Sequence, residues 1–420
     1  MATKVYRRVI VLVAASLCCG ATGCVYMWSI FNKPLMAAHG WAQADVALAY
    51  SLYLVMVCLM GFICGWMQTK MSPKKLVLIA GTLFGGGWIL TAFANSLPML
   101  YLSFSVIAGA GNGFIYNTSV TVAQKWYPDR RGLASGLCIG LAGLAPVVFA
   151  PLGNYFIAAF DVSTAFILVG VIILVLYWVF AQFLKLPEPG WKPEGWEPPA
   201  SLGAANCLSD LKTTTMLRQP LFWVMWLTLC AACTSGTMMT GNASNIGQDL
   251  AGLTAAQGAM QVGIFAVGGF CGRFGFASLS DKIGRHNTFL IMLGANAVVM
   301  LFFLNGARDF LSFTVCLVII GACFGGSMAT MASLCGDNFG TANYGQNYAF
   351  VYSGFTMSSF TGSWCAALCM QLTGTYFASF MVAGFLSAAG FLLVFLMKHL
   401  EKKLKAKNIH EVELPAASDK

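Results

Sequence analysis

Apolar stretches of helix length recur along the whole chain and are separated by short polar turns. A helix needs about twenty apolar residues to cross a hydrocarbon core roughly 30 Å thick. Because these runs are continuous rather than alternating, they predict helices and not barrel strands. Twelve spans are expected, at about residues 9–31, 46–68, 75–95, 98–121, 133–157, 163–185, 220–242, 258–279, 287–306, 309–333, 345–370 and 375–398. The pattern therefore predicts an all-α membrane protein.

The longest polar segment lies in the middle of the chain, at residues 187–218. Its run of prolines disfavours a long helix, so we interpret it as a linker between two groups of six helices. We expect four parts: a first six-helix bundle at 1–186, the linker at 187–218, a second six-helix bundle at 219–400, and a tail at 401–420.

The two groups of helices also look like copies of one another. Gly109-Ala-Gly-Asn-Gly113 in the fourth span has a counterpart in Gly321-Ala-Cys-Phe-Gly325 of the tenth, 212 residues later. The loops after the second and eighth spans match at the same spacing. Repeated halves around a central site are typical of secondary transporters.

Composition and charge placement agree with a membrane location. Of the 420 residues, 58% are hydrophobic and 9% are charged, whereas soluble domains carry about 25% charged residues. If both termini are cytoplasmic, 21 of the 24 lysines and arginines lie in cytoplasmic segments, and Lys33 and Arg308 lie outside. The positive-inside rule thus predicts cytoplasmic termini.

The remaining cation is Arg273, which lies inside the apolar segment 258–279. Asp281, in the following loop, is eight residues away, or roughly 12 Å of helix at 1.5 Å per residue, so we expect Arg273 near the membrane midplane. A guanidinium there costs about 2.5–3.5 kcal/mol on insertion scales, and such residues usually mark a substrate path.

Other function classes find little support in the sequence. A basic face on a soluble domain, as nucleic-acid binding requires, is missing, and so are a nucleophile–base pair, a metal-ligand cluster and a phosphate loop. We therefore expect neither an enzyme nor a bound cofactor or metal. A membrane sensor that binds an anion without moving it is an alternative, although the 187–218 segment and the tail offer no sizeable output domain.

Several motifs resemble those of a known family. The turn Asp281-Lys282-Ile-Gly284-Arg285 resembles the loop motif of the major facilitator superfamily, and a Gly-bearing turn flanked by charges lets two helices pack closely. More specific motifs resemble the oxalate/formate antiporter family, which is related to the monocarboxylate transporters. They are Gly23-Cys-Val-Tyr26-Met-Trp28-Ser, Lys125-Trp-Tyr-Pro-Asp-Arg130-Arg131-Gly and Asn347-Tyr348-x3-Tyr352. The resemblance covers essentially the whole chain and implies the major facilitator fold in a bacterial inner membrane.

The resemblance also implies a substrate site. The arginine of the eighth helix in this family binds the substrate carboxylate, and Arg273 matches it; the family's cavity aromatics match Tyr26 and Tyr116. Asn117, Tyr348 and Tyr352 add polar groups on helices that line the cavity in this architecture. The oxalate carriers place a lysine in the eleventh helix where this chain has Phe355, so the resemblance does not extend to oxalate specificity.

Charge counting then narrows the substrate. A dianion beside one arginine leaves an uncompensated negative charge in a medium of low dielectric, which costs several kcal/mol. A monocarboxylate forms a neutral pair and accepts two hydrogen bonds from the guanidinium fork. We expect a monomeric carrier, surrounded by lipid, for acids such as lactate, pyruvate or formate. Carboxylate exchange and proton coupling stay open, as does an oxalate/formate antiporter.

Overall fold

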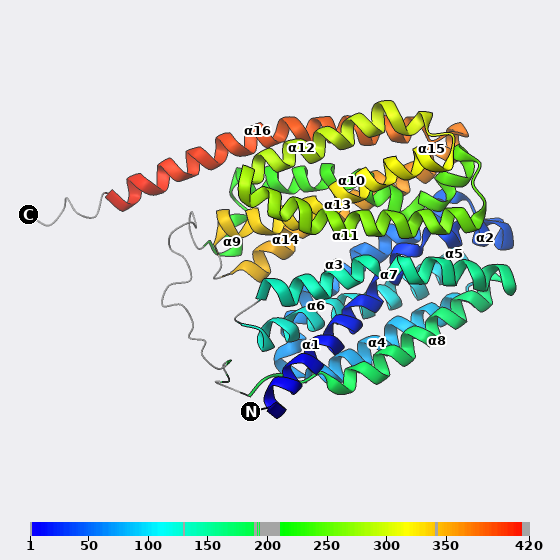
Figure 1. The fold of residues 1–420 in the computed structure, drawn as a ribbon, viewed down its shortest axis with the longest axis horizontal. Helices are drawn as coiled ribbons and strands as arrows, with labels where there is room; N and C mark the ends of the chain where they lie inside the picture. The colour runs from blue at the N-terminus through cyan, green and yellow to red at the C-terminus, as the bar shows by residue number, and fades with distance from the viewer. Residues whose placement is uncertain are drawn as a thin grey trace, which may run out of the picture.

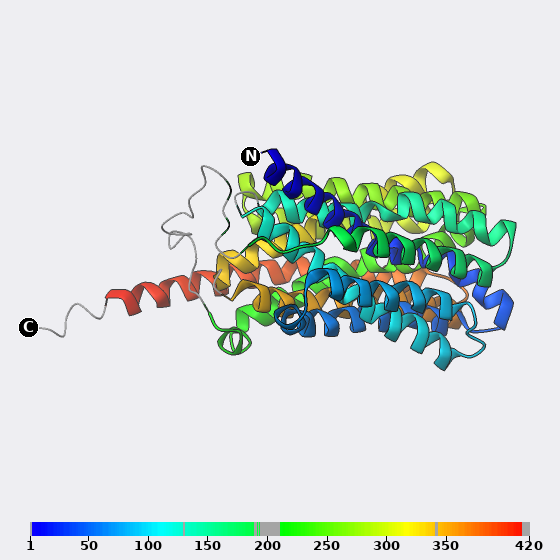
Figure 2. The ribbon, with the colours of Figure 1, turned by 90° about the horizontal axis from the view of Figure 1, so that it is seen from below.

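The computed structural model describes residues 2–128, 131–188, 191, 193, 211–340 and 343–413. The described residues form helices and connecting turns, as the sequence predicts (Figure 1). Helices of the first half of the chain pack together, and those of the second half pack beside them. The beginning of α1 and the C-terminal part of α16 lie at the same end of the bundle in both views (Figures 1 and 2). Short helices α2, α5 and α15 lie at the opposite end.

The first half contains eight α-helices with three short irregular helices between or after them. They are α1 (Ala2–Thr22), η1 (Gly23–Met27), α2 (Ser29–His39), α3 (Gln43–Lys70), α4 (Pro73–Thr91), α5 (Leu97–Leu100), η2 (Tyr101–Ala108), α6 (Gly109–Trp126), α7 (Arg131–Ala159), α8 (Val162–Phe180) and η3 (Ala181–Phe183).

The second half has the same plan. Its elements are α9 (Thr213–Met216), α10 (Pro220–Ala251), α11 (Ala255–Ile283), α12 (Arg285–Val298), η4 (Val299–Phe303), η5 (Leu304–Gly306), α13 (Phe310–Phe339), α14 (Tyr344–Ser359), η6 (Phe360–Trp364), α15 (Cys365–Thr373) and α16 (Phe377–Glu413).

Helix occurs at every position where a membrane span is expected, but ten helices in the described ranges are long and apolar enough to cross a membrane. The two that fall short are α4 and the α14–α15 stretch. The first has Lys74 and Lys75 in its first turn and holds four glycines, whereas the second is rich in serine and threonine.

Some boundaries differ from the expectation. The first span, expected without interruption over 9–31, contains the 3₁₀ turn Gly23–Met27, and the helix then continues as α2. Gly23 lies so close to α7 that an added Cβ would collide with the carbonyl oxygen of Ala142. The expected tail at 401–420 is helical as far as Glu413, because α16 continues beyond the apolar segment. Most of the linker, at 194–210, lies outside the described residues.

The two halves are joined by polar contacts at the end that carries α2. The Lys33 ammonium on α2 forms an ion pair with Asp249 of α10, with 2.5 Å between Nζ and Oδ1. Asn32 donates to the carbonyl oxygen of Gly241 at 2.9 Å, and Gln43 donates to the Tyr376 hydroxyl at 2.7 Å. These contacts hold the halves together at this end of the molecule.

Candidate functional site

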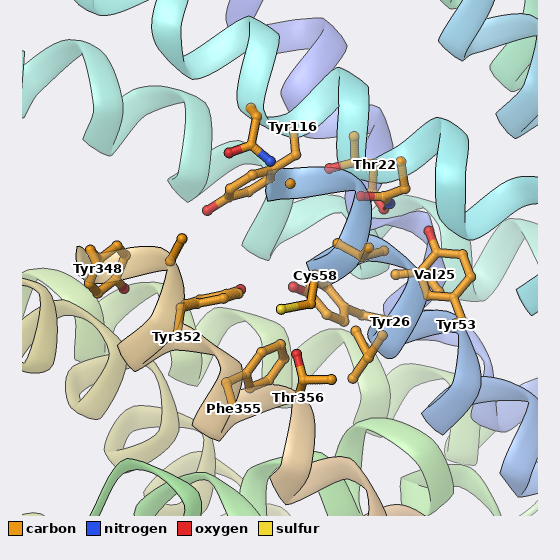
Figure 3. Close-up of a pocket in the computed structure, with 16 residues that line it drawn as sticks. Thr22, Val25, Tyr26, Tyr53, Cys58, Tyr116, Tyr348, Tyr352, Phe355 and Thr356 are labelled. Carbon is orange, nitrogen blue, oxygen red and sulfur yellow. Dashed lines mark hydrogen bonds between the residues drawn. The ribbon is translucent and has the colours of Figure 1, made fainter. Parts of the chain in front are cut away.

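A cavity of about 170 Å³ lies between the halves and is lined by four helical segments (Figure 3). From the first half come the α1–η1 junction, α3 and α6, and from the second half comes α14. Its lining residues are Thr22, Val25, Tyr26, Tyr53, Leu54, Val57, Cys58, Gly61, Asn112, Tyr116, Asn117, Tyr348, Ala349, Tyr352, Phe355 and Thr356.

Six of the seven residues proposed from the sequence as substrate ligands line this cavity: Tyr26, Tyr116, Asn117, Tyr348, Tyr352 and Phe355. Residues of α14 spaced three or four apart share one helix face, and that face points into the cavity in Figure 3. The ring centroids of Tyr348 and Tyr352 are 5.8 Å apart, and those of Tyr352 and Phe355 are 5.2 Å apart. The rings of Tyr348, Tyr352 and Phe355 thus pack in a row along the α14 side of the cavity.

Phe355 is mostly a packing residue, although one edge of it lines the cavity. It is 2% exposed, and its ring centroid lies 5.9 Å from that of Phe324 on α13. An apolar ring therefore occupies this position of the cavity wall.

The contribution of α3 was not anticipated from the sequence. Tyr53, Leu54, Val57, Cys58 and Gly61 all come from this helix. Each is an ordinary residue in an apolar span, and their exposure to the cavity depends on how α3 is rotated. The repeat offered one signal, because α3 is the counterpart of α11, which carries Arg273.

Polar groups on the first half of the cavity wall are held by hydrogen bonds. Asn112 donates to the carbonyl oxygen of Thr22 at 3.0 Å and thereby ties α6 to α1. Asn117 donates to the carbonyl oxygen of Gly113 one turn earlier, at 2.9 Å. The second N–H and the side-chain oxygen of Asn117 are therefore left to interact with a solute.

Arg273 does not belong to the lining of this cavity. It lines a smaller one of about 20 Å³, together with Tyr26, Gly143, Thr240 and Phe324 among others. Tyr26 borders both cavities, so it stands between the guanidinium and the larger space.

The guanidinium of Arg273 has unused hydrogen-bonding capacity. Its Nε and Nη1 atoms are buried and have no hydrogen-bond partner among the described residues. Buried donors are almost always paired in folded proteins, and leaving one unpaired costs about 1–3 kcal/mol, more for a charged group. Nε and Nη1 lie on different sides of the planar guanidinium, so these two atoms do not form one fork. The group is nevertheless a charged donor without a partner, which suits an anion such as a carboxylate.

Local structure on both sides of Arg273 fixes the position of α11. At its start, Thr254 accepts from the backbone N–H of Gln257 at 3.2 Å, while the Gln257 side chain accepts from the Thr254 N–H at 2.9 Å. Such a capping box satisfies two otherwise free backbone donors. At its end, Gly284 has a φ of 90°, which favours glycine and lets α12 begin at once.

The predicted signature turn is a charged network around that glycine. Arg285 donates to Ser280 at 2.6 Å and forms ion pairs with Asp281 and with Asp337 at the end of α13. Lys282 is exposed. The network joins three helices at the end of the bundle that holds the termini, and its residues line neither of the two cavities. Arg130, and the side chain of Arg131 at the start of α7, lie outside the described residues.

Comparison with known proteins places the chain in a family. A model described as "Major Facilitator Superfamily" matches residues 11–304 and 252–418. The chain belongs to the major facilitator superfamily, and it is a multi-pass membrane transporter. Within that superfamily it is a member of the oxalate/formate antiporter family. It is 31% identical over 363 residues to the oxalate:formate antiporter of Oxalobacter formigenes, covering 85% of this chain and 84% of that one.

Two further comparisons agree. Monocarboxylate transporter 13 of Rattus norvegicus is 24% identical over 371 residues, which cover 88% of this chain and 83% of that one. A bacterial homolog of the human lysosomal transporter Spinster, solved in an inward-facing and unoccupied conformation, superposes with a TM-score of 0.63 at 13% identity. That superposition covers 96% of this chain and 98% of the solved one, and it supports the fold alone.

Proposed function

We propose that this protein is a secondary active transporter of small monocarboxylates, such as lactate, pyruvate or formate, that works by alternating access. The observation that carries the proposal is the Arg273 guanidinium, which has unpaired buried donors, next to a small cavity rich in hydroxyl groups. In the proposed complex the carboxylate binds at Tyr26, where the two cavities meet. The guanidinium and the Tyr26 hydroxyl donate to it, and the rest of the acid occupies the larger cavity.

The size and charge of the cavity support a small, singly charged solute. Its volume of about 170 Å³ is below the roughly 300–1,000 Å³ of pockets for drug-sized ligands. Its lining includes tyrosine hydroxyls and apolar groups such as Val25, Leu54 and Phe355, but no lysine or arginine. One guanidinium balances one carboxylate, and a second carboxylate would remain uncompensated.

An oxalate/formate antiporter is the second candidate, and sequence similarity to such a carrier favours it. Its difficulty is the missing second cation, since Phe355 occupies the position where a lysine is expected. Formate is compatible with both candidates, whereas oxalate is compatible with the second alone.

We further propose that the carrier exchanges one carboxylate for another. A substrate-free Arg273 is a buried, unpaired charge, and reorientation of the empty carrier would carry that charge through the low-dielectric interior at a cost of several kcal/mol. Binding of a second substrate neutralises it. In the proposed orientation both termini are cytoplasmic, in a bacterial inner membrane.

Counterflow in proteoliposomes tests the function. Purified protein is reconstituted, the lumen is loaded with one unlabelled acid, and uptake of a labelled acid is followed with and without a pH gradient. We expect lumenal lactate, pyruvate or formate to accelerate uptake, and oxalate to have little effect. Protein-free liposomes are the control. Uptake driven by the pH gradient without lumenal substrate would replace exchange by proton symport. Binding without any uptake would favour the sensor, and a clear preference for oxalate would favour the second candidate.

A further inference from the structure

The repeat detected in the sequence extends to the helix boundaries. The helices α3 and α11 begin at Gln43 and Ala255, and α4 and α12 begin at Pro73 and Arg285, so both pairs are separated by 212 residues. At this spacing the counterpart of Arg273 in the first half is Gly61, and the counterpart of Phe355 is Gly143. Each large side chain in the second half therefore corresponds to a glycine in the first.

Gly143 is also the residue on which the Arg273 guanidinium rests. A Cβ added at Gly143 would lie 1.8 Å from Nη1 and 2.9 Å from Cζ of Arg273. Gly143 is on α7 and Arg273 is on α11, so this contact crosses between the two halves. The missing side chain of Gly143 is what gives the guanidinium room against the α7 backbone.

Neighbouring glycines on α7 have more space between them and α11 than Gly143 has. A Cβ at Gly140 would approach the Phe270 ring at 2.9 Å, and one at Gly136 would reach the Phe274 ring at an ordinary 3.8 Å. The closest approach along this stretch of α7 therefore occurs at the charged residue. On the α13 side, a Cβ at Gly325 would lie 3.1 Å from Cγ of Arg273, so the arginine stem is confined as well.

We propose that Gly143 is a positioning residue for substrate recognition: it seats the Arg273 guanidinium against α7, with Nη1 toward Gly143, and so fixes the orientation in which the group meets a carboxylate. Gly61, the counterpart of Arg273, lines the larger cavity and brings no charge to it. The inference rests on the proposed function, because it assigns the seated guanidinium to a carboxylate substrate.

An alanine at Gly143 must displace the guanidinium. Nonbonded contacts of a Cβ essentially never fall below 3.0 Å, so Nη1, at 1.8 Å, would have to move by more than an ångström. Misplacement of about 1 Å in a site that depends on oriented groups can cost about a hundredfold. The displaced guanidinium would no longer be oriented toward the carboxylate.

The test compares Gly143→Ala with Gly136→Ala, a matched change on the same helix that meets Phe274 at van der Waals distance. Exchange of labelled lactate or pyruvate is measured as initial rate against concentration. We expect Gly143→Ala to raise the half-saturating concentration at least tenfold, with a smaller effect on the maximal rate, and Gly136→Ala to change it less than twofold. An unchanged half-saturating concentration in Gly143→Ala, or an equal rise in both variants, overturns the proposal.

A double-mutant cycle separates positioning from simple packing. Thermal midpoints in detergent, without substrate, are measured for Gly143→Ala in the wild-type and the Arg273→Lys backgrounds. Lysine lacks the branched end that meets the new methyl group, so the midpoint should fall clearly in the first background and little in the second. If Gly143→Ala does not fold, the double variant should recover folding. Equal loss in both backgrounds contradicts the proposal. Should the wild type exchange no monocarboxylate, the proposed function fails, whereas this cycle still decides whether Gly143 seats Arg273.

Discussion

Helices α3 and α11 correspond to one another in the two halves, yet they contribute very different groups to the site. α3 presents Tyr53, Leu54, Val57, Cys58 and Gly61 to the larger cavity, and all of these are uncharged. α11 contributes a guanidinium that lies behind Tyr26 in the smaller cavity. Their starting positions still differ by the repeat spacing of 212 residues, so the backbone plan has been kept while the side chains at the site have diverged.

The difference between α3 and α11 shows how a fold built from two similar halves can have an asymmetric binding site. A site with a cation on both helices would suit a solute with a negative charge at each end. Here one counterpart is an arginine and the other a glycine, so one end of the site is charged and the other is apolar and hydroxyl-rich. A small acid with one carboxylate has the same asymmetry. The proposed specificity thus follows from the loss of symmetry between α3 and α11.

Replacing the guanidinium fork of Arg273 should reduce exchange more than any other change on α3 or α11. Arg273→Lys keeps the charge but cannot offer two parallel donors to one carboxylate. Loss of a hydrogen bond to a charged group costs about 1.5–3 kcal/mol, and each 1.4 kcal/mol is about tenfold. We therefore expect exchange at low substrate concentration to fall about ten- to hundredfold, measured in proteoliposomes.

Folding must be intact for that result to count. The elution profile and thermal midpoint of Arg273→Lys should stay close to those of the wild type, because Nε and Nη1 have no hydrogen-bond partner in the described protein. Normal exchange by a folded Arg273→Lys would exclude Arg273 as the carboxylate receptor.

Restoring a second cation should have the next largest effect. Phe355→Lys places an ammonium on the α14 wall of the larger cavity. If the number of cations sets selectivity, inhibition of lactate exchange by oxalate should increase about tenfold, while the affinity for monocarboxylates decreases. Phe355→Met is the control, since it removes the ring packed on Phe324 and Tyr352 without adding charge. Equal selectivity in the two variants would show that cavity shape decides.

The fold and most of the site could be predicted from the sequence because their signals are local. Apolar runs of helix length predict the helices. The single arginine inside one of these runs, Arg273, was predicted to bind substrate for that reason. The family resemblance at Tyr26, Tyr116 and Tyr352 marked the faces of three helices that meet in the cavity.

Other features depend on packing, which no local pattern reports. The lining by Cys58 and Tyr53 follows from the rotation of α3, and the separation of Arg273 from the larger cavity follows from where Tyr26 lies. The break in the first span at Gly23 arises from the close approach of α7. To predict such features, one must know which helix packs alongside as well as the sequence of the helix itself.

Tyr26→Phe should change exchange least among these variants, and it tests whether the carboxylate binds at the boundary between the larger and the smaller cavity. Tyr26 is the residue common to both linings, so its hydroxyl is placed to donate to a carboxylate that also binds Arg273. A neutral hydrogen bond contributes about 0.5–1.5 kcal/mol, and the half-saturating concentration should therefore rise about two- to tenfold. Tyr53→Phe is a matched control, because Tyr53 lines the larger cavity alone. If Tyr53→Phe weakens binding more than Tyr26→Phe, the carboxylate binds on the α3 side, away from the guanidinium.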